Sequence, residues 1–334
     1  MRKRLLGTGL AVIAMVVMLA GSAGAAPPLP TSFPGDFPVL VDSSLGSPVI
    51  GFGASAPVAR TPVIFLHGNN DTPFPTACNP FFGDIHDLAS SLLARGYSAA
   101  ELWGLGYQGE QCDILADPTL RSGVAHSTVA NVPDLRRFVH AVLEYTGAKR
   151  VDIVGHSLGG TLARTWMRED SAYHLVRRLA TIDSPHHGII NCGPLALGNF
   201  WALPAFGGFT PESAVCREYG ADDTPFLRWL NAGSETLGGT RVFSVRNADR
   251  SFVYIPVQDG LLPPVPAIDR DGDPHDFSQS ARLRGAENVT VTGQGTFDPI
   301  LGTAHLGILN SPAVWTLVAD FLTRPKPGPN NGSG

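Results

Sequence analysis

The pentapeptide Gly155-His156-Ser157-Leu158-Gly159 places a serine between two glycines in the pattern G-x-S-x-G. The apolar run 151–154 leads into it, and a helical pattern over 158–168 follows it. A serine on such a turn takes a strained backbone conformation that directs its hydroxyl out of the sheet. The pattern therefore predicts that Ser157 is a nucleophile. The alternative is an ordinary strand–helix connection in which the serine caps the helix.

Two backbone N–H groups are expected to complete the chemistry of such a serine. Acyl transfer puts negative charge on the carbonyl oxygen, and N–H donors must already point at that position. One expected donor is Leu158, directly after the nucleophile. The other is expected at Asn69, in the loop after the apolar strand 63–66. His67 precedes this loop and comes before the serine, so we interpret it as a packing residue.

A general base is expected late in the chain, because the partners of such a serine follow in the order acid, then histidine. His305 is best placed, between the expected strand 289–291 and the expected helix 312–322. The other histidines after the serine are His174, His186, His187 and His275. We therefore expect His305 to be the base, with a packed or surface role as the alternative.

Asp249 is the expected acid, because it follows the expected strand 241–245. Such an acid holds the imidazole in the right tautomer and stabilises the imidazolium. Asp259 is the alternative, although Asp259-Gly260 reads more simply as an ordinary turn.

The order of the expected elements indicates an α/β fold. Strands and helices alternate, which favours a mostly parallel central sheet with helices on both faces. Expected strands cover 63–66, 97–105, 151–154, 175–182, 241–245 and 289–291, and expected helices cover 81–94, 128–145, 158–168 and 312–322. Residues 188–240 are rich in glycine, proline and aromatic residues with weak periodicity, and we expect them to form a cap-like insert.

The first 26 residues are typical of a signal peptide. Basic residues at 2–4 precede the uncharged apolar run 10–19, and Ala23-Gly24-Ala25 supplies the small residues of a cleavage site. The alternative is a membrane anchor, but the run is short for a span. We expect one catalytic domain over 27–324 and a disordered tail over 325–334. The net charge of −5 provides no basic surface for nucleic acid.

Four cysteines remain after the expected cleavage, and an even number in an exported chain favours two disulfides. They are Cys78, Cys112, Cys192 and Cys216. Three pairings are open in principle. We favour Cys78–Cys112 and Cys192–Cys216, since each pair brackets one local segment. A metal site is the alternative, and the spacing does not support it.

Two further clusters in the sequence could bind ligands. Phe200, Trp201, Phe206 and Phe209 lie close together in the insert and are expected to bind the apolar part of an ester. The alternative is a local core under a long loop. Asp269, Asp271 and Asp273 leave calcium binding open, although a solvated acidic loop is the simpler interpretation. No other cofactor is expected.

These motifs resemble those of known α/β-hydrolases. His67-Gly68, the serine pentapeptide, Asp249 and His305 look like the bacterial lipases of class 2, with 244–249 and 302–309 similar to the acid and base loops of that family. Residues 63–160 also resemble an extracellular poly(3-hydroxybutyrate) depolymerase, through motifs such as His67-Gly68-Asn69-Asn70-Asp71 and Tyr145-Thr146-Gly147. The likeness to the depolymerase is lost after residue 190.

The resemblance implies an α/β-hydrolase fold and a triad of Ser157, Asp249 and His305. It implies a secreted serine carboxylic ester hydrolase that acts through an acyl-enzyme on hydrophobic, lipid-like esters or their aggregates. A polyester depolymerase is the first alternative. The alternative from another class is a non-catalytic binding protein of the same fold.

Overall fold

The computed structural model describes residues 33, 57–69, 85–107, 127–189, 192, 209–247, 267–275, 277–293 and 304–325. The expected signal peptide, residues 1–26, lies outside this part of the chain, as does 326–334. Cys78 and Cys112 also lie outside it.

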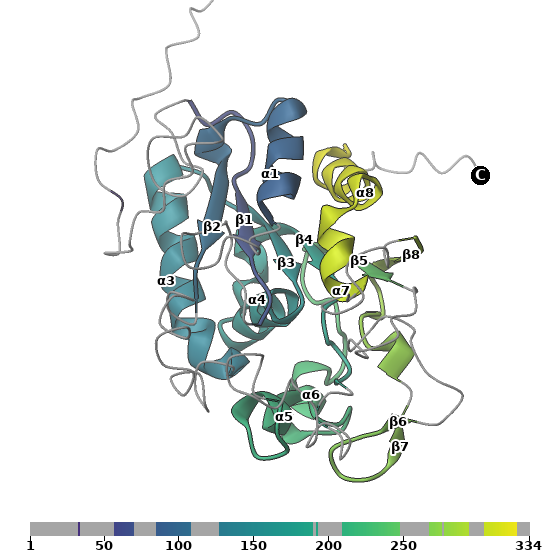
Figure 1. The fold of residues 1–334 in the computed structure, drawn as a ribbon. Helices are drawn as coiled ribbons and strands as arrows, with labels where there is room; N and C mark the ends of the chain where they lie inside the picture. Colours follow the sequence, from purple (N-terminus) through teal and green to yellow (C-terminus); the bar gives the residue numbers. More distant parts are fainter. Residues whose placement is uncertain are drawn as a thin grey trace, which may run out of the picture.

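A six-stranded sheet forms the centre of the described fold, and every neighbouring pair of strands is parallel (Figure 1). The strand order is β2-β1-β3-β4-β5-β8. The strands are β1 (Val63–Leu66), β2 (Leu102–Leu105), β3 (Val151–His156), β4 (Val176–Ile182), β5 (Arg241–Asn247) and β8 (Glu287–Val291). The predicted parallel sheet is thus confirmed. Parallel strands place all their carboxyl ends at one edge of the sheet, where the turn after β3 carries Ser157.

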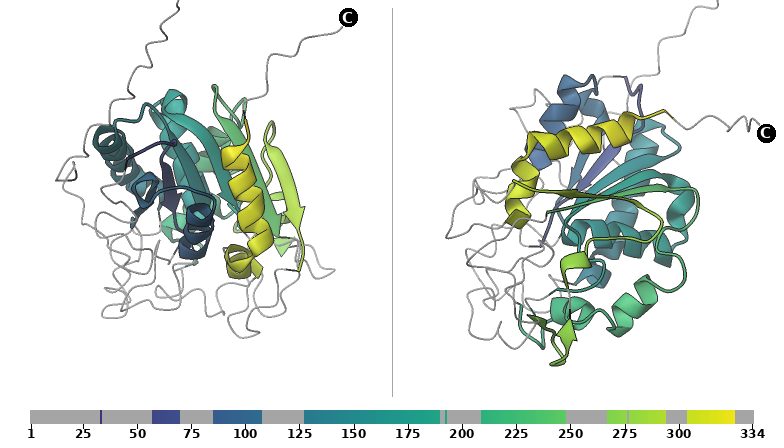
Figure 2. Two further views of the ribbon diagram at one scale, coloured as in Figure 1. Left: turned by 90° about the horizontal axis from the view of Figure 1, so that it is seen from above. Right: turned by 90° about the vertical axis from the view of Figure 1, so that its right-hand side faces the viewer.

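Helices cover both faces of this sheet, as the right-hand view of Figure 2 shows. Helices α1 (Ile85–Ala94) and α8 (Pro312–Thr323) pack on one face, and α3 (Thr128–Thr146) and α4 (Leu158–Glu169) pack on the other. A short antiparallel pair, β6 (Ala267–Ile268) and β7 (Pro274–His275), stands apart from the sheet. In the part of the chain that the structure describes, no helix has the length and hydropathy of a membrane span.

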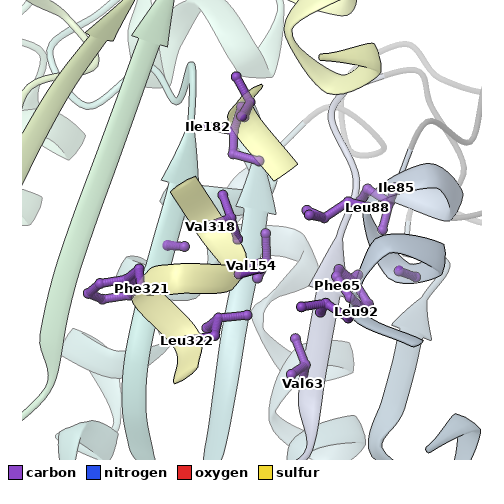
Figure 3. Close-up of a cluster of buried hydrophobic side chains, with 14 of the residues drawn as sticks. Val63, Phe65, Ile85, Leu88, Leu92, Val154, Ile182, Val318, Phe321 and Leu322 are labelled. Carbon is purple, nitrogen blue, oxygen red and sulfur yellow. The ribbon is translucent and has the colours of Figure 1, made fainter. Parts of the chain in front are cut away.

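The core is divided by the sheet because side chains of a strand alternate between its two faces. In β1, Val63 and Phe65 enter the cluster under α1 and α8, whereas Ile64 and Leu66 enter the cluster under α3 and α4. Figure 3 shows Phe65 against Leu92 on one side of the first cluster. All four β1 side chains are fully buried, so the strand is held rigidly on both faces. The loop that follows β1 therefore starts from a fixed point.

The expected strand 97–105 is wrong in its first half. Residues Ala99–Glu101 form a 3₁₀ turn, and the strand begins only at Leu102. The buried Glu101 carboxylate explains this, because it accepts the backbone N–H groups of Ser98, Ala59 and Arg60. A side chain that satisfies local backbone donors in this way competes with a strand ladder.

The insert contains two short helices that the sequence did not predict, α5 (Ala214–Tyr219) and α6 (Pro225–Leu230). Each helix has six residues, which is too short for a clear apolar periodicity. Figure 1 shows them beyond α4, on the side of the molecule away from α8. The disulfide Cys192–Cys216 is present, as predicted, and both cysteines are fully buried.

Removing this disulfide is expected to destabilise the fold. The bond closes a segment of 24 residues, which corresponds to about 3 kcal/mol in the chain-entropy account. A variant with Cys192→Ser and Cys216→Ser should lose about that much free energy of unfolding, measured by denaturant titration against the oxidised wild type. An unchanged denaturation midpoint would show that the disulfide does not stabilise the folded protein relative to the unfolded chain.

Candidate active site

Ser157 lies between β3 and α4 and has a strained backbone. Its dihedral angles are φ 51° and ψ −126°, which L-residues rarely adopt. A backbone hydrogen bond ties this turn to the sheet, since the Ser157 N–H donates to the carbonyl of Ile182 in β4 at 2.9 Å. The side chain is 9% exposed. This is the strand–turn–helix conformation that the G-x-S-x-G pattern predicts.

The glycines of the pattern allow this turn. A Cβ atom on Gly155 would stand 2.4 Å from the backbone nitrogen of Gly160, and one on Gly159 would stand 2.3 Å from the carbonyl oxygen of Leu66. Helix α4 therefore passes too close to β3 and β1 for any larger residue. The same contact brings the end of β1 against the start of the helix.

The two expected oxyanion donors lie on these two segments. Leu158 is the first residue of α4, so its backbone N–H belongs to the unpaired N-terminal turn of that helix. Asn69 follows Gly68 in the loop after β1. A Cβ on Gly68 would stand 3.1 Å from Cβ of Ser157, which places this loop beside the nucleophile. His67 is buried and stacks on Tyr107 with ring centroids 4.0 Å apart, in agreement with a packing role.

His305 lies on the short helix α7 (Ala304–Gly307) and is joined to the nucleophile turn by His156. Nε2 of His156 donates to the backbone carbonyl of His305 at 2.9 Å, and the two ring centroids are 4.6 Å apart. Burial, followed by the charge of His305, lowers the pKa of His156 well below its ordinary value. His156 is therefore neutral, and as the residue next to Ser157 it ties the segment that carries His305 to the serine turn.

Among the described residues, Asp183, directly after β4, has a carboxylate beside His305. Its Oδ2 atom is 3.7 Å from Nδ1 of His305. Asp249 and Asp259 lie outside the described residues, so Asp249 stays a prediction. Sequence reasoning missed both Asp183 and His156. The signal was present for Asp183, since it follows the apolar strand 175–182 at the sheet edge that also carries the serine.

The remaining histidines after the serine have other surroundings. His174 is exposed, and His187 and His275 lie near carboxylates, 3.6 Å from Glu235 and Asp222 respectively. His186 is buried between Arg164, which donates to Nδ1 at 3.2 Å, and the hydroxyl of Thr181, which is 3.2 Å from Nε2. Arginine has no acceptor, so this arrangement requires a neutral His186 with its proton on Nε2.

Acid is expected to destabilise the fold through His186. Burial, followed by the charges of Arg164 and His187, lowers the pKa of His186 well below that of an unfolded chain, about 6.5. Below that pH the unfolded state binds the proton and the folded state does not, so stability falls as pH falls. The loss reaches about 1.4 kcal/mol for each pH unit below 6.5. Denaturant unfolding at pH 7 and pH 5 should show a smaller loss for His186→Gln, and an equal loss would contradict a neutral His186.

The expected ligand-binding clusters are only partly described. Phe209 packs on an apolar cluster that contains Leu158 and the disulfide. Phe200, Trp201 and Phe206 lie outside the described residues. The insert therefore reaches the residue next to the nucleophile.

In the acidic loop, Oδ1 of Asp269 accepts the backbone N–H groups of Asp271 and Asp273, both at 2.9 Å. The side chains of Asp271 and Asp273 are exposed. Among the described residues, no group of three or more histidine, cysteine or acidic side chains could hold a metal ion. Calcium binding in this loop stays a prediction.

Residues 60–253 match the family model of the lipases of class 2, which is more than half of the 334-residue chain. The chain belongs to the class 2 lipase family. Membership supports a carboxylic ester hydrolase, the class of enzyme that the sequence predicts. The match covers Ser157, Asp183 and Asp249 but ends before His305. In this class 2 lipase, His305 is connected to the matched region by the hydrogen bond from His156 to its backbone carbonyl.

Two solved structures of one bacterial lipase share the fold of this class 2 lipase. The mature form of lipase BlEst2 from Bacillus licheniformis has a TM-score of 0.52 and 19% identity, over 80% of this chain and 96% of that one. The propeptide form of the same lipase has a TM-score of 0.50 and 18% identity, over 81% of this chain and 53% of that one. Lipase B from Aspergillus fumigatus has a TM-score of 0.47 and 16% identity. That match covers 87% of this chain, which spans 59% of the Aspergillus lipase.

Proposed function

We propose that this protein is a secreted serine carboxylic ester hydrolase that acts on lipid-like esters through an acyl-enzyme. One observation carries the proposal. The strained Ser157 is the N-cap of α4 at the sheet edge, and His156 beside it holds the segment that carries His305. Family membership identifies the kind of bond that such a pair attacks.

The proposed reaction has two halves. Nε2 of His305 takes the proton of the Ser157 hydroxyl while its oxygen attacks the ester carbonyl carbon. The backbone N–H groups of Leu158 and Asn69 receive the negative charge on the carbonyl oxygen. The ester bond then breaks, and the alcohol leaves with the proton from His305. Water, activated by the same imidazole, releases the acid from Ser157. Asp249 is the acid expected from sequence, and Nδ1 of His305 is the atom that a carboxylate must hold.

Export of the chain is supported by two independent features. The buried disulfide Cys192–Cys216 is of a kind that persists in oxidising compartments. The basic start, apolar run and small residues of 1–26 match a signal peptide. We therefore propose that the protein acts outside the cytoplasm.

The aromatic residues of the insert support the proposal that the substrate is hydrophobic. Phe209 packs on the apolar cluster that contains Leu158, so this aromatic residue of the insert lies near the serine turn. Burial of apolar surface on docking contributes roughly 25 cal/mol per Å² before the costs of ordering. Trp201 and Phe206 are the residues that we propose to contact the acyl part or an ester aggregate. An aliphatic polyester is the second candidate substrate, because residues 63–160 resemble a depolymerase.

A substrate panel tests this proposal. Wild type and a variant with Trp201→Ala and Phe206→Ala are compared on p-nitrophenyl acetate, tributyrin, emulsified olive oil and amorphous polyhydroxybutyrate. The variant should retain turnover of p-nitrophenyl acetate and lose turnover of the insoluble esters. The matched control is Trp229→Ala, an insert tryptophan that is 40% exposed and stacks with Arg168, and it should behave as wild type on all four.

Two outcomes would contradict the docking role. If the double variant loses all activities together with a lower melting temperature, the aromatic residues form core. If wild type hydrolyses p-nitrophenyl acetate but none of the insoluble esters, the protein acts on small esters. The relative rates on olive oil and polyhydroxybutyrate decide between the two substrate classes.

A further inference from the structure

Two buried polar atoms face each other at the end of β4 without a hydrogen bond. They are Oδ2 of Asp183 and Nδ1 of His305, which are 3.7 Å apart. Among the residues that the structure describes, neither atom has a hydrogen-bond partner. The Asp183 side chain is 0% exposed and that of His305 is 14% exposed. Buried polar atoms without partners are rare, so the pairing of an acceptor with a potential donor requires an explanation.

Asp183 is held firmly in the position from which it faces His305. Its backbone N–H donates to the carbonyl of Val245 in β5, and its Oδ1 accepts the backbone N–H of Asn247 at 2.7 Å. Its φ of 44° is a conformation that non-glycine residues rarely adopt. These two contacts with β5 fix the carboxylate and leave Oδ2 directed at the imidazole.

We propose that Asp183 is the carboxylate that positions His305 by accepting its Nδ1–H. This inference rests on the proposed roles of Ser157 and His305 and changes the expected acid from Asp249 to Asp183. The 3.7 Å separation suits an ion pair, and hydrogen bonds of active sites shorten when substrate is bound. With its proton on Nδ1, His305 presents a free Nε2 to the serine hydroxyl.

The surroundings of His305 support a charge partner on this side. His156 packs against the ring, with centroids 4.6 Å apart, and is neutral, because burial lowers its pKa. The imidazolium that forms during the reaction therefore meets no positive charge from His156. Asp183 supplies the compensating negative charge in a buried place, where it is screened little by water.

The sequence pattern predicts the acid after β5, whereas Asp183 follows β4. Sheet topology explains how the acid can be at either position. The two strands are neighbours and parallel, so the loops after both strands begin at the same edge of the sheet. The serine turn contacts the end of β4 directly, through the bond from Ser157 N–H to the Ile182 carbonyl. Asp183 is the next residue. A carboxylate at this position reaches the base without any further loop.

The substitution Asp183→Asn tests the inference because the asparagine side chain has nearly the same size and shape as that of aspartate. Its carbonyl oxygen can still accept the Asn247 N–H, while its amide N–H₂ then faces Nδ1 of His305. A donor at that point requires Nδ1 to be an acceptor, which moves the imidazole proton to Nε2, the wrong tautomer for a base. We expect kcat to fall by about 10³-fold to 10⁴-fold with KM changed by less than about threefold, as for tautomer loss in other triads.

The tautomer is measured directly by ¹⁵N NMR of labelled histidine in a Ser157→Ala background. Neutral His305 should carry its proton on Nδ1 with Asp183 and on Nε2 with Asp183→Asn. This readout needs no turnover, so it stands even if the proposed esterase activity is wrong. Asp152→Asn is the matched control. Asp152 is also buried, but it forms an ion pair with Arg177 at the other end of β3. This substitution should leave both kcat and the tautomer unchanged.

Three results would overturn the inference. The first is an Asp183→Asn variant with kcat within about fivefold of wild type. The second is loss of activity with the Nδ1 tautomer retained, which would make Asp183 a purely structural link to β5. The third is an Nδ1 proton that moves in Asp249→Asn and stays in Asp183→Asn, which would return the role to Asp249.

Discussion

Replacing Ser157 with alanine is expected to lower kcat for ester hydrolysis by about 10⁶-fold, because no other oxygen can form the acyl-enzyme. The fold should be unaffected, since the hydroxyl does not cap α4 and the strain at φ 51° belongs to the backbone. Turnover of p-nitrophenyl butyrate and the melting temperature are measured together. A large loss of activity with an unchanged melting temperature is the expected pair of results.

Ser171→Ala is the matched control for this variant. Ser171 also has a positive φ, 53°, but it lies in an exposed turn after α4. Ser171 is in the left-handed region (φ 53°, ψ 34°), whereas Ser157 has the rarer pair φ 51° and ψ −126°. The control therefore tests the loss of a serine hydroxyl at positive φ, and the melting temperature of Ser157→Ala reports any strain specific to that turn. If Ser157→Ala retained activity within tenfold of wild type, the acyl-enzyme mechanism would be wrong. The non-catalytic alternative predicts that wild type itself has no turnover.

His305→Ala is expected to lower kcat almost as far, because a serine hydroxyl is a poor nucleophile without a base to take its proton. Losses within such a unit are not additive, so a variant with both Ser157→Ala and His305→Ala should be no worse than Ser157→Ala alone. Steady-state kinetics of the three variants measures this. The equality of the two serine variants is the sharper part of the prediction.

His174→Ala is the control for the base, since His174 is exposed and lies on the 3₁₀ turn before β4. It should retain the activity of wild type. Activity that survives His305→Ala and is lost in His187→Ala would contradict the assignment of the base. His187 is the histidine to compare, because it lies only four residues beyond Asp183 in the loop after β4.

The parts of the site that local sequence determines could be predicted. The apolar run, the glycines and the helical pattern around Ser157 lie within one strand–turn–helix unit, and the structure has that unit. The pairing of Cys192 with Cys216 could be favoured because the cysteines bracket one segment, and that bond is present.

The contacts made in three dimensions could not be predicted. The role of Asp183 depends on the distance from the end of β4 to α7, and these segments are more than a hundred residues apart. His156 occupies a variable position of the serine pattern, and only the folded chain shows that its ring donates to the His305 carbonyl. The helices of the insert were missed for a local reason, since six residues give too few apolar positions to define a face.

Covalent trapping tests the central claim, a nucleophilic Ser157 activated by His305, most directly. The protein is incubated with a p-nitrophenyl alkylphosphonate, which transfers its phosphonyl group to an activated serine and releases p-nitrophenol. Intact mass and peptide mapping should show one adduct per chain, on the peptide that contains Ser157, with none in Ser157→Ala and much slower labelling in His305→Ala. Stoichiometric labelling of another residue, or an equal rate in His305→Ala, would contradict the account.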